Sequence, residues 1–242
     1  MKILFRDKDI IVCIKPAGVV STDEPGGTPE LIKKEIGEEL PVRTVHRLDS
    51  VVAGLMVYAL SQEAASGLST QITDGSFTKE YMAVTEGCLK EKAGELRDWL
   101  RRNQKERKTY AVEKMGRDAQ EAILLYHVLS EKEDCSLVRV KLITGRTHQI
   151  RAQFSSRSLP LYSDRKYGAV HKDAGIALWS CHLLFRHPVT GEEMDFSAMP
   201  PTRTPWTMFD GYHTAYEEQD VQVEFKRSAA IGNCPHAYAC EG

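Results

Sequence analysis

Four consecutive residues gather three kinds of polar chemistry at the edge of an apolar segment. His46, Arg47 and Asp49 supply an imidazole, a guanidinium and a carboxylate, with Leu48 among them, and a long apolar run follows over residues 51–60. An isolated charge is very costly to bury, so charges at the edge of a core strand need partners or water. The pattern indicates a site, although an ordinary turn with a structural Arg–Asp pair would place the same residue types together.

A second polar cluster follows a later apolar strand. Gly145 ends that strand, Thr147 is positioned to cap a helix that runs from His148 towards Phe154, and the backbone N–H groups at a helix start favour anions. Arg151 lies three and four residues after His148 and Thr147, so these side chains share one face. A helix with ordinary polar exposure is the alternative, and two Arg, a His and a Gln beside a strand end make it less favoured.

A third polar feature ends a nearly wholly apolar strand over residues 10–14. The sequence continues with Lys15, Pro16, Ala17 and Gly18. Pro and Gly after the Lys make a fixed turn that can present the ammonium group. A plain turn at the end of a strand is the alternative.

The whole chain has the length and composition of an ordinary globular protein. Its 242 residues are 42% hydrophobic and 27% charged, which suits one large domain or two small ones. No apolar run approaches the length that spans a bilayer, and the N-terminus has no signal-peptide core. The six Cys lack the spacing of a disulfide framework, so we expect a cytoplasmic protein with no membrane partner.

Charge is unevenly distributed, although the formal net charge is only −2. Residues 97–117 are markedly basic, and so are residues 139–166, where Asp164 is the only acid. Acids concentrate in residues 23–39 and again after Asp210. A phosphate-binding face opposite an acidic rim is one interpretation, but from charge alone a solvated surface of mixed charge is favoured.

The regular pattern ends near residue 209. Residues 1–209 are predicted to form one domain, and the acidic, polar segment over residues 210–242 is expected to be a disordered tail. Cys234, His236 and Cys240 near its end could bind a soft metal ion. Two Cys and one His are too few for a structural zinc site, so we expect no metal there.

The apolar patterns predict a chain rich in strands. Thr28 and Ser61 are predicted to cap two helices, which end near residues 40 and 72. Gly54 lies inside a predicted central strand, where it allows a close backbone approach. Strands are expected over residues 3–5, 10–14, 51–60, 77–86, 108–114, 121–129, 136–142, 176–185 and 194–196.

Several common functional motifs are absent. The sequence contains no Walker loop, no glycine-rich dinucleotide fingerprint after a strand, and no HExxH motif. These absences argue against nucleotide-driven, redox and zinc-hydrolase chemistry. We therefore expect no cofactor and no nucleotide partner.

Four blocks of the chain resemble the RluA family of RNA pseudouridine synthases, in order and at similar spacing. The resemblance covers roughly residues 3–196. It departs from the family at Val52 and Ala53, where a small polar pair is usual, and at Ser163-Asp164, where Gly-Asp is common. The blocks are residues 10–18, residues 46–49 with the strand after them, Lys79-Glu80-Tyr81 leading to Glu86-Gly87, and residues 142–151 followed by Leu159-Pro160 and residues 164–168.

The resemblance implies a fold and a reaction. The fold is one α/β (α+β) domain with a mixed, mostly antiparallel sheet, flanking helices and a central cleft. The reaction converts uridine within ribosomal or transfer RNA to its C5-glycoside without a cofactor. Many members carry an N-terminal S4 RNA-binding domain, whereas this chain starts directly at the catalytic domain, so we expect it to find its RNA as a monomer without that domain.

By resemblance, three residues carry the chemistry. Asp49 is the essential carboxylate, which attacks the sugar or abstracts a proton from it, and the sequence does not decide between the two. Arg151 orients Asp49, and Tyr81 stacks on the target uracil and helps to remove its C5 proton. The expected substrate contacts are Arg47, which fills the space left by the flipped base, His46, Ile150 as an apolar wall, Lys15, Arg146 and His148 near phosphates or as supports of the loops, and residues 97–117 as an outer contact.

Two other functions fit parts of the pattern. A catalytically silent RNA-binding or ribosome-assembly factor of the same fold would need RNA affinity but not Asp49, and the intact set of Asp49, Tyr81 and Arg151 favours the enzyme. A hydrolase of small glycosides with a carboxylate nucleophile would need a second carboxylate facing Asp49, and none stands out in the sequence.

Overall fold

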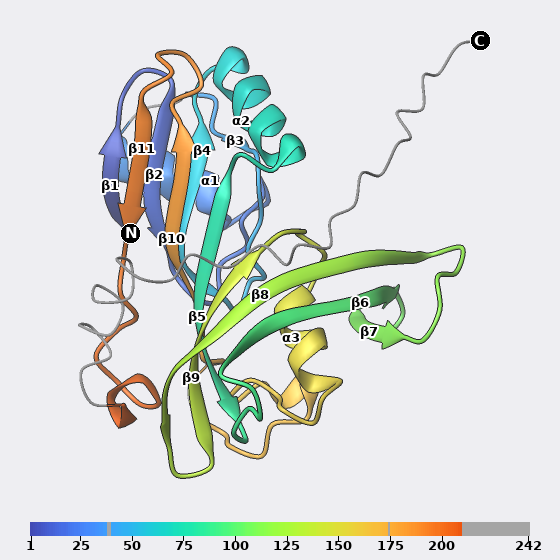
Figure 1. The fold of residues 1–242 in the computed structure, drawn as a ribbon. Coiled ribbons are helices and arrows are strands. Elements are labelled where there is room, and N and C mark those ends of the chain that lie inside the picture. Colours follow the sequence, from blue (N-terminus) through green and yellow to red (C-terminus); the bar gives the residue numbers. More distant parts are fainter. Residues whose placement is uncertain (38–39, 174, 210–242) are drawn as a thin grey trace.

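One large sheet organises the part of the chain that the computed structural model describes, residues 1–37, 40–173 and 175–209. Its order is β1-β2-β4-β10-β5-β9-β8-β6-β7, with β11 beside β10 and β3 beside β4 (Figure 1). All neighbouring strands are antiparallel except the pair β4 and β10. The predicted mixed, mostly antiparallel sheet is therefore confirmed. The strands are β1 (Lys2–Arg6), β2 (Ile10–Lys15), β3 (Arg43–Thr44), β4 (Ala53–Ala59), β5 (Thr78–Glu86), β6 (Ala93–Asn103), β7 (Lys108–Val112), β8 (Ala119–Lys132), β9 (Cys135–Leu142), β10 (Leu178–Arg186) and β11 (Glu193–Ser197).

Helices α1 (Thr28–Ile36) and α2 (Gln62–Asp74) pack on opposite faces of the strands β2 and β4. Side chains alternate along a strand, so Ile11 packs in one apolar cluster with Ile32 of α1, while Ile10 packs in another with Leu68 of α2. Continuous apolar strands are the expected sequence of a sheet covered on both faces. This half of the sheet is therefore a rigid support for the loops at its lower edge in Figure 1.

The two predicted helix caps have different outcomes. The Ser61 side chain accepts a hydrogen bond from the backbone N–H of Ala64 over 3.1 Å, which confirms Ser61 as the cap of α2. Thr28, in contrast, is the first residue of α1, and Gly27 occupies the cap position. The Thr28 hydroxyl donates to the carbonyl of Val20 at 2.9 Å, so it ties the preceding loop to the helix and does not cap it.

Strand β6 was not predicted. Together with β7 and the part of β8 that pairs with it, residues 119–127, it forms an arm that curves around helix α3 (Gln149–Ser155) (Figure 1). The apolar alternation in β6 is sparse, because only Leu96 and Leu100 are buried apolar side chains. Asp98 shares their face of the strand, where it accepts a hydrogen bond from Gln153 at 2.7 Å and forms an ion pair with Arg157 at 2.9 Å. Partly buried polar contacts from a distant segment thus hide the strand pattern in the sequence.

The two halves of the sheet meet where β4 and β10 approach closely. They pair through Trp179 with Ala53 and through Ser180 with Gly54, and β10 has an irregularity between Ser180 and His182. Gly54 has a φ angle of +122°, and a Cβ atom there would lie 2.3 Å from the carbonyl oxygen of Ser180. The predicted close backbone approach at Gly54 is therefore confirmed. Ser180 also pairs with Tyr81 of β5, so only strand β10 separates the start of β4 from Tyr81.

Two further expectations concern membrane-spanning helices and the C-terminal residues. Among the described residues, no helix is long and apolar enough to cross a membrane. Residues 210–242, including Cys234, His236 and Cys240, lie outside the described residues. The division of the chain at residue 209 stays a prediction.

Gly54→Ala should destabilise the protein by roughly 3 kcal/mol or more, because the added methyl group meets backbone and the φ angle is unfavourable for L-residues. The matched control is Gly191→Ala, since Gly191 also has a positive φ of +76° but no atom within 4 Å of its Cβ position. That control should cost only about 1 kcal/mol. Urea unfolding of both variants checks the prediction, and equal costs would contradict the close approach.

Candidate active site

Asp49, Tyr81 and Arg151 come together from three distant segments. Asp49 lies in the loop before β4, Tyr81 in β5, and Arg151 in the first turn of α3. The Nη1 atom of Arg151 donates to Oδ2 of Asp49 at 2.9 Å. The Arg151 side chain is 5% exposed and that of Asp49 is 21% exposed. The carboxylate is therefore held from inside the protein while part of it still faces the solvent.

The other side of the Arg151 guanidinium is bound by Asp164, which is 1% exposed. Nε and Nη2 donate to the two oxygens of Asp164 over 2.7 and 2.9 Å. The ring of Tyr167, from the short helix η1 (Arg165–Tyr167), lies 4.9 Å from the guanidinium carbon. A bidentate pair fixes the plane of a guanidinium, so Nη1 has a defined direction towards Asp49.

His148 is a second group that faces Asp49, and its tautomer follows from its partners. The backbone N–H of Thr109 donates to the Tyr167 hydroxyl at 2.9 Å, and this hydroxyl lies 2.8 Å from Nδ1 of His148. We assign the Tyr167 hydroxyl as the donor to Nδ1, so Nδ1 of His148 carries no proton. The ring proton of His148 is then on Nε2, 3.8 Å from Oδ2 of Asp49. Burial lowers the pKa of His148 to about 4, against the attraction of Asp49, so the imidazole is neutral at pH 7.

The start of α3 differs by one residue from the prediction. His148 occupies the cap position, where Thr147 was expected, and it has a left-handed backbone with φ of 56°. The Gln149 side chain fixes this turn. Its oxygen accepts hydrogen bonds from the backbone N–H of Arg146 at 2.9 Å and from the Thr144 hydroxyl at 2.8 Å. The turn thereby directs His148 and Arg151 to one side, as the spacing predicted.

Tyr81 forms part of the apolar wall of the site. It is 5% exposed and belongs to the same apolar cluster as Ile150, which is 4% exposed. Burial raises the pKa of Tyr81, and the negative charge of Asp49 raises it further. The phenol therefore keeps its proton at neutral pH, and its ring provides a flat apolar surface beside a carboxylate.

Lys15 binds the backbone beside Asp49 and stabilises the loop that carries this residue. Its ammonium group is fully buried and donates to the carbonyls of Pro16, Val19 and Ser50, at 2.8, 2.6 and 3.2 Å. Burial lowers its pKa to about 8, while the charge of Asp49 opposes this effect. Of the two roles considered for Lys15, this geometry favours the support of loops over a phosphate contact.

His46 does not join the cluster around Asp49. It is 8% exposed, its Nε2 accepts from the backbone N–H of Val57 at 3.1 Å, and its ring lies 5.6 Å from that of Phe77. Burial lowers its pKa to about 3, with a smaller effect from Lys79. A neutral, buried imidazole that binds the backbone favours a structural role over the predicted substrate contact.

Arg47 and Arg146 lie at the surface next to these loops. Arg47 is exposed and forms no hydrogen bond or ion pair within residues 1–37, 40–173 and 175–209. Arg146 is also exposed, and its Nε donates to the carbonyl of Glu121 at 2.9 Å, which leaves its charge without a carboxylate there. Both remain predicted contacts of an anionic substrate.

Sequence reasoning missed Asp164 and Tyr167 as members of the site. In the sequence Asp164 is the one acid of a basic stretch and matches the Asp of the family's Gly-Asp pair, and Tyr167 lies in a loop, but neither pattern assigns a role in the site. One signal could have identified Asp164: it is the only acid within residues 139–166, so a buried Arg of that stretch has a single local candidate for its partner. For Tyr167, the contact with Thr109 spans 58 positions, and no local pattern indicates it.

Asp164→Asn should destabilise the protein by roughly 3 kcal/mol or more, because it leaves a buried guanidinium with only Asp49 as a charged partner. The matched control is Glu95→Gln, which breaks an ion pair with Arg97 whose side chains are 39% and 50% exposed. That change should cost about 1 kcal/mol at most. Thermal and urea unfolding measure both, and a loss at Asp164 as small as at Glu95 would contradict its anchoring role.

The chain is similar to known proteins over most of its length. A family described as RNA pseudouridylate synthase matches residues 9–156. An RNA pseudouridine synthase of Aquifex aeolicus is 34% identical over 224 residues, which cover 83% of this chain and 70% of the relative. The ribosomal large subunit pseudouridine synthase D of Vibrio vulnificus is 32% identical, with 83% and 67% covered.

Solved structures agree with this result. The human RNA pseudouridylate synthase domain containing 4 has a TM-score of 0.69 at 25% identity and covers 83% of this chain, with 89% of that chain covered. The human domain containing 1 shares the fold, with a TM-score of 0.72 at 22% identity and 84% of each chain covered. The resemblance found in the four sequence blocks is confirmed, and the chain belongs to the RNA pseudouridine synthase family.

Proposed function

We propose that this protein isomerises specific uridines in a structured ribosomal or transfer RNA, with Asp49 as the essential carboxylate. As a member of its family it is an isomerase that acts on RNA. The observation that carries the proposal is the state of Asp49. Its carboxylate is oriented by the buried Arg151 at 2.9 Å and faced by a neutral His148, yet remains partly open to solvent.

The reaction exchanges one bond of the base for another. The bond between N1 of uracil and C1′ of ribose breaks, C5 joins C1′, and the C5 hydrogen leaves as a proton while N1 gains one. No electrons are gained or lost. Asp49 can act by attack on the sugar or by abstraction of a sugar proton, and a carboxylate held by one hydrogen bond keeps lone pairs for either role.

Tyr81 is best suited to hold the uracil ring. Its raised pKa, caused first by burial and then by Asp49, disfavours the phenolate that proton abstraction would need. A protonated phenol can still stack on the base and donate a hydrogen bond. We therefore assign Tyr81 to stacking, with Ile150 as the apolar wall beside it, and the base that takes the C5 proton stays open.

The exposed Arg47 lies two positions before Asp49, where its guanidinium can enter the RNA helix as the target base leaves it. A flipped base leaves a gap that costs a few kcal/mol in lost stacking and pairing. A planar guanidinium can stack in that gap and contact phosphates at the same time. The absence of an ion-pair partner for Arg47 in the described part of the chain fits this role.

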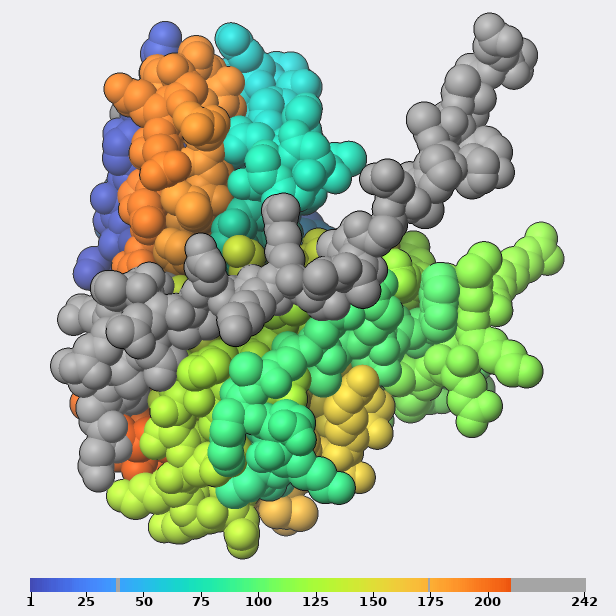
Figure 2. Space-filling model, in the orientation of Figure 1, coloured from blue at the N-terminus to red at the C-terminus, as the bar shows by residue number. Residues whose placement is uncertain are grey.

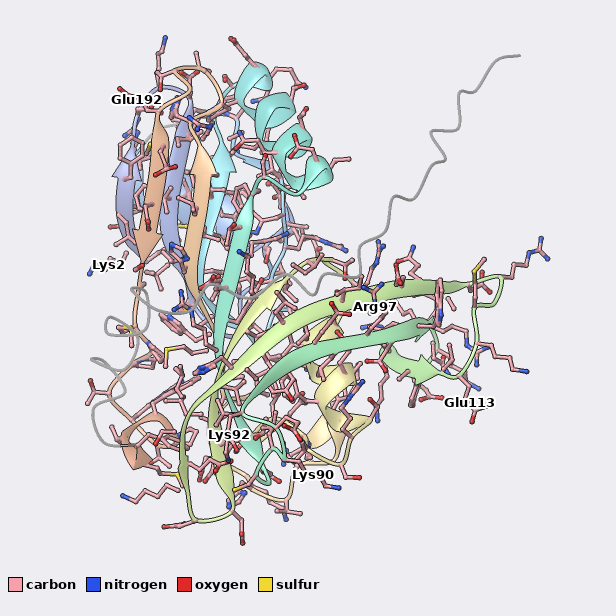
Figure 3. The ribbon with its side chains drawn as sticks, in the orientation of Figure 1. Lys2, Lys90, Lys92, Arg97, Glu113 and Glu192 are labelled. Atoms are coloured by element: carbon pink, nitrogen blue, oxygen red, sulfur yellow. The ribbon has the colours of Figure 1, made fainter. Side chains whose placement is uncertain are left out.

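The arm formed by β6, β7 and residues 119–127 of β8 is the proposed outer RNA contact. Arg97 on β6 is neutralised by Glu95 and Glu121, and Glu113 lies at the far end (Figure 3). Arg101 and Lys105, in contrast, are exposed and have no ion-pair partner among the described residues. Figure 2 shows the light green end of this arm projecting away from the rest of the molecule. A projecting cationic strand suits the backbone of a folded RNA.

A glycoside hydrolase is less consistent with this site. Such an enzyme needs a second carboxyl group that can protonate the leaving group. The acid connected to Asp49 through Arg151 is Asp164, which is 1% exposed and gives both its oxygens to that guanidinium. It is not available as a general acid.

Asp49→Asn should lower the release of tritium from RNA labelled at uracil C5 by at least about 10³-fold, because the amide is neither a nucleophile nor a base. The affinity for RNA should stay close to that of the unaltered protein. The RNAs offered are unmodified transcripts of large-subunit ribosomal RNA, the substrate that the name of the Vibrio vulnificus relative indicates, and of transfer RNA, in separate assays.

The control for this change is Asp134→Asn, which removes an exposed carboxylate in the turn between β8 and β9 and should leave the rate unchanged. Residual activity of Asp49→Asn above a small fraction would contradict the essential role. No release by the unaltered protein from either RNA, despite tight binding, would instead support a silent RNA-binding factor.

Replacement of Arg101, Arg102 and Lys105 together by Gln should weaken RNA binding and flatten its salt dependence. Removal of one phosphate interaction should lower the slope of log K against log salt by about 0.7 for single strands and 0.9 for duplex. A triple control at Lys2, Lys8 and Lys132, all exposed and outside the arm, removes the same charge. Fluorescence titration at several salt concentrations measures both slopes, and equal slopes would place the RNA elsewhere.

A further inference from the structure

Lys79 is a half-buried cation on the strand that carries Tyr81, and it has no anionic partner within the described residues. Burial lowers its pKa, and no carboxylate contributes to raise it. Its closest aromatic contact is the Phe77 ring, with Nζ 5.9 Å from the centroid, at the limit of a cation–π interaction. An ammonium group that is partly removed from water without a counterion is unfavourable for the folded protein.

The Lys79 ammonium group lies between the two loops that build the site. A Cβ atom on Gly145 would be 3.6 Å from Nζ, which places the group over the loop before α3. On the other side, the charge of Lys79 contributes to the lowered pKa of His46, in the loop before β4. Lys79 and Tyr81 are two residues apart in β5, so their side chains leave the same face of the strand, about 7 Å apart along it.

Two more cations follow directly in the same two loops. Arg47 comes after His46 and Arg146 comes after Gly145, both are exposed, and neither is ion-paired in the part of the chain that the structure describes. Arg97 on β6 and Arg139 on β9, by contrast, have carboxylate partners in Glu95 and Glu80. The three cations Lys79, Arg47 and Arg146 therefore form a rim without local compensation of its charge.

We infer that Lys79 binds a backbone phosphate of the RNA at the nucleotide flipped onto Tyr81, or at its immediate neighbour. The inference rests on the proposed function and adds a specific anchor for the substrate backbone. A phosphate oxygen supplies the counterion that the folded protein lacks at Lys79, and a partly desolvated pair is stronger than one in bulk water. Such an anchor positions the sugar of the target nucleotide over Asp49.

The alternative is a Lys79 that only packs its methylene chain against Phe77. The two roles differ in the effect of Lys79→Met, which keeps the length and apolar character of the side chain. Loss of an unpaired, half-buried charge should leave the melting temperature unchanged or raise it. If the lysine is a structural residue, the melting temperature should fall instead.

The experiment compares Lys79→Met, Lys79→Arg and the control Lys132→Met, which removes an exposed charge at the end of β8. With the transcript that supports tritium release, Lys79→Met should lower kcat/KM at least about tenfold, and Lys79→Arg should recover most of this loss. For binding to a fluorescent single-stranded oligouridylate, the magnitude of the slope of log K against log salt should fall by about 0.7 in Lys79→Met and stay unchanged in Lys132→Met.

Three results would overturn the inference: kcat/KM and salt slope of Lys79→Met equal to those of Lys132→Met, a marked fall in its melting temperature, or no recovery by Lys79→Arg. Failure of the proposed function is a different outcome. In that case the unaltered protein would bind RNA without releasing tritium, while the difference in salt slope between Lys79→Met and Lys132→Met would still report the phosphate contact.

Discussion

The site depends on one guanidinium that is shared by two carboxylates. Arg151 gives two of its donors to the buried Asp164 and a third to Asp49. A single Arg–Asp pair would leave both side chains free to rotate together, whereas the bidentate pair with Asp164 fixes the guanidinium before Asp49 contacts it. Tyr167 adds a ring beneath the guanidinium at 4.9 Å and also holds His148 through its hydroxyl. The loop after α3 thus determines the geometry of a carboxylate more than one hundred residues earlier in the chain.

The sheet provides the other half of this geometry through its backbone. Gly54 allows β4 to approach Ser180 of β10 so closely that no side chain fits between them. At the lower edge, the buried ammonium of Lys15 collects three carbonyls, including that of Ser50, directly after Asp49. Both features are costly for stability, since a glycine loses more backbone freedom on folding than other residues and the ammonium group of Lys15 is desolvated. Such costs are expected where the chain must hold a functional loop in one position.

The sequence predicts the elements better than the contacts between them. The strand around Gly54 and the cap at Ser61 follow from local patterns, and the structure confirms both. Strand β6 was missed because Asp98 on its inner face is paired with Gln153 of α3 and with Arg157, contacts that no local pattern encodes. The roles of Asp164 and the buried position of His46 also depend on partners far along the chain. The resemblance to a family supplied the topology and the pairing of Arg151 with Asp49, which residue patterns alone would not have produced.

The distribution of charge explains how a chain with a formal net charge of −2 can act on a polyanion. Some cations of the fold are neutralised locally, as Arg139 is by Glu80. Two cations near the site, Arg47 and Lys79, have no carboxylate partner among the described residues. Local potential and not total charge attracts RNA, because charges farther apart than about 10 Å are screened at moderate salt. Under the proposed function, the uncompensated rim of Lys79, Arg47 and Arg146 attracts the RNA backbone, and the oriented Asp49 beside it acts on the nucleotide.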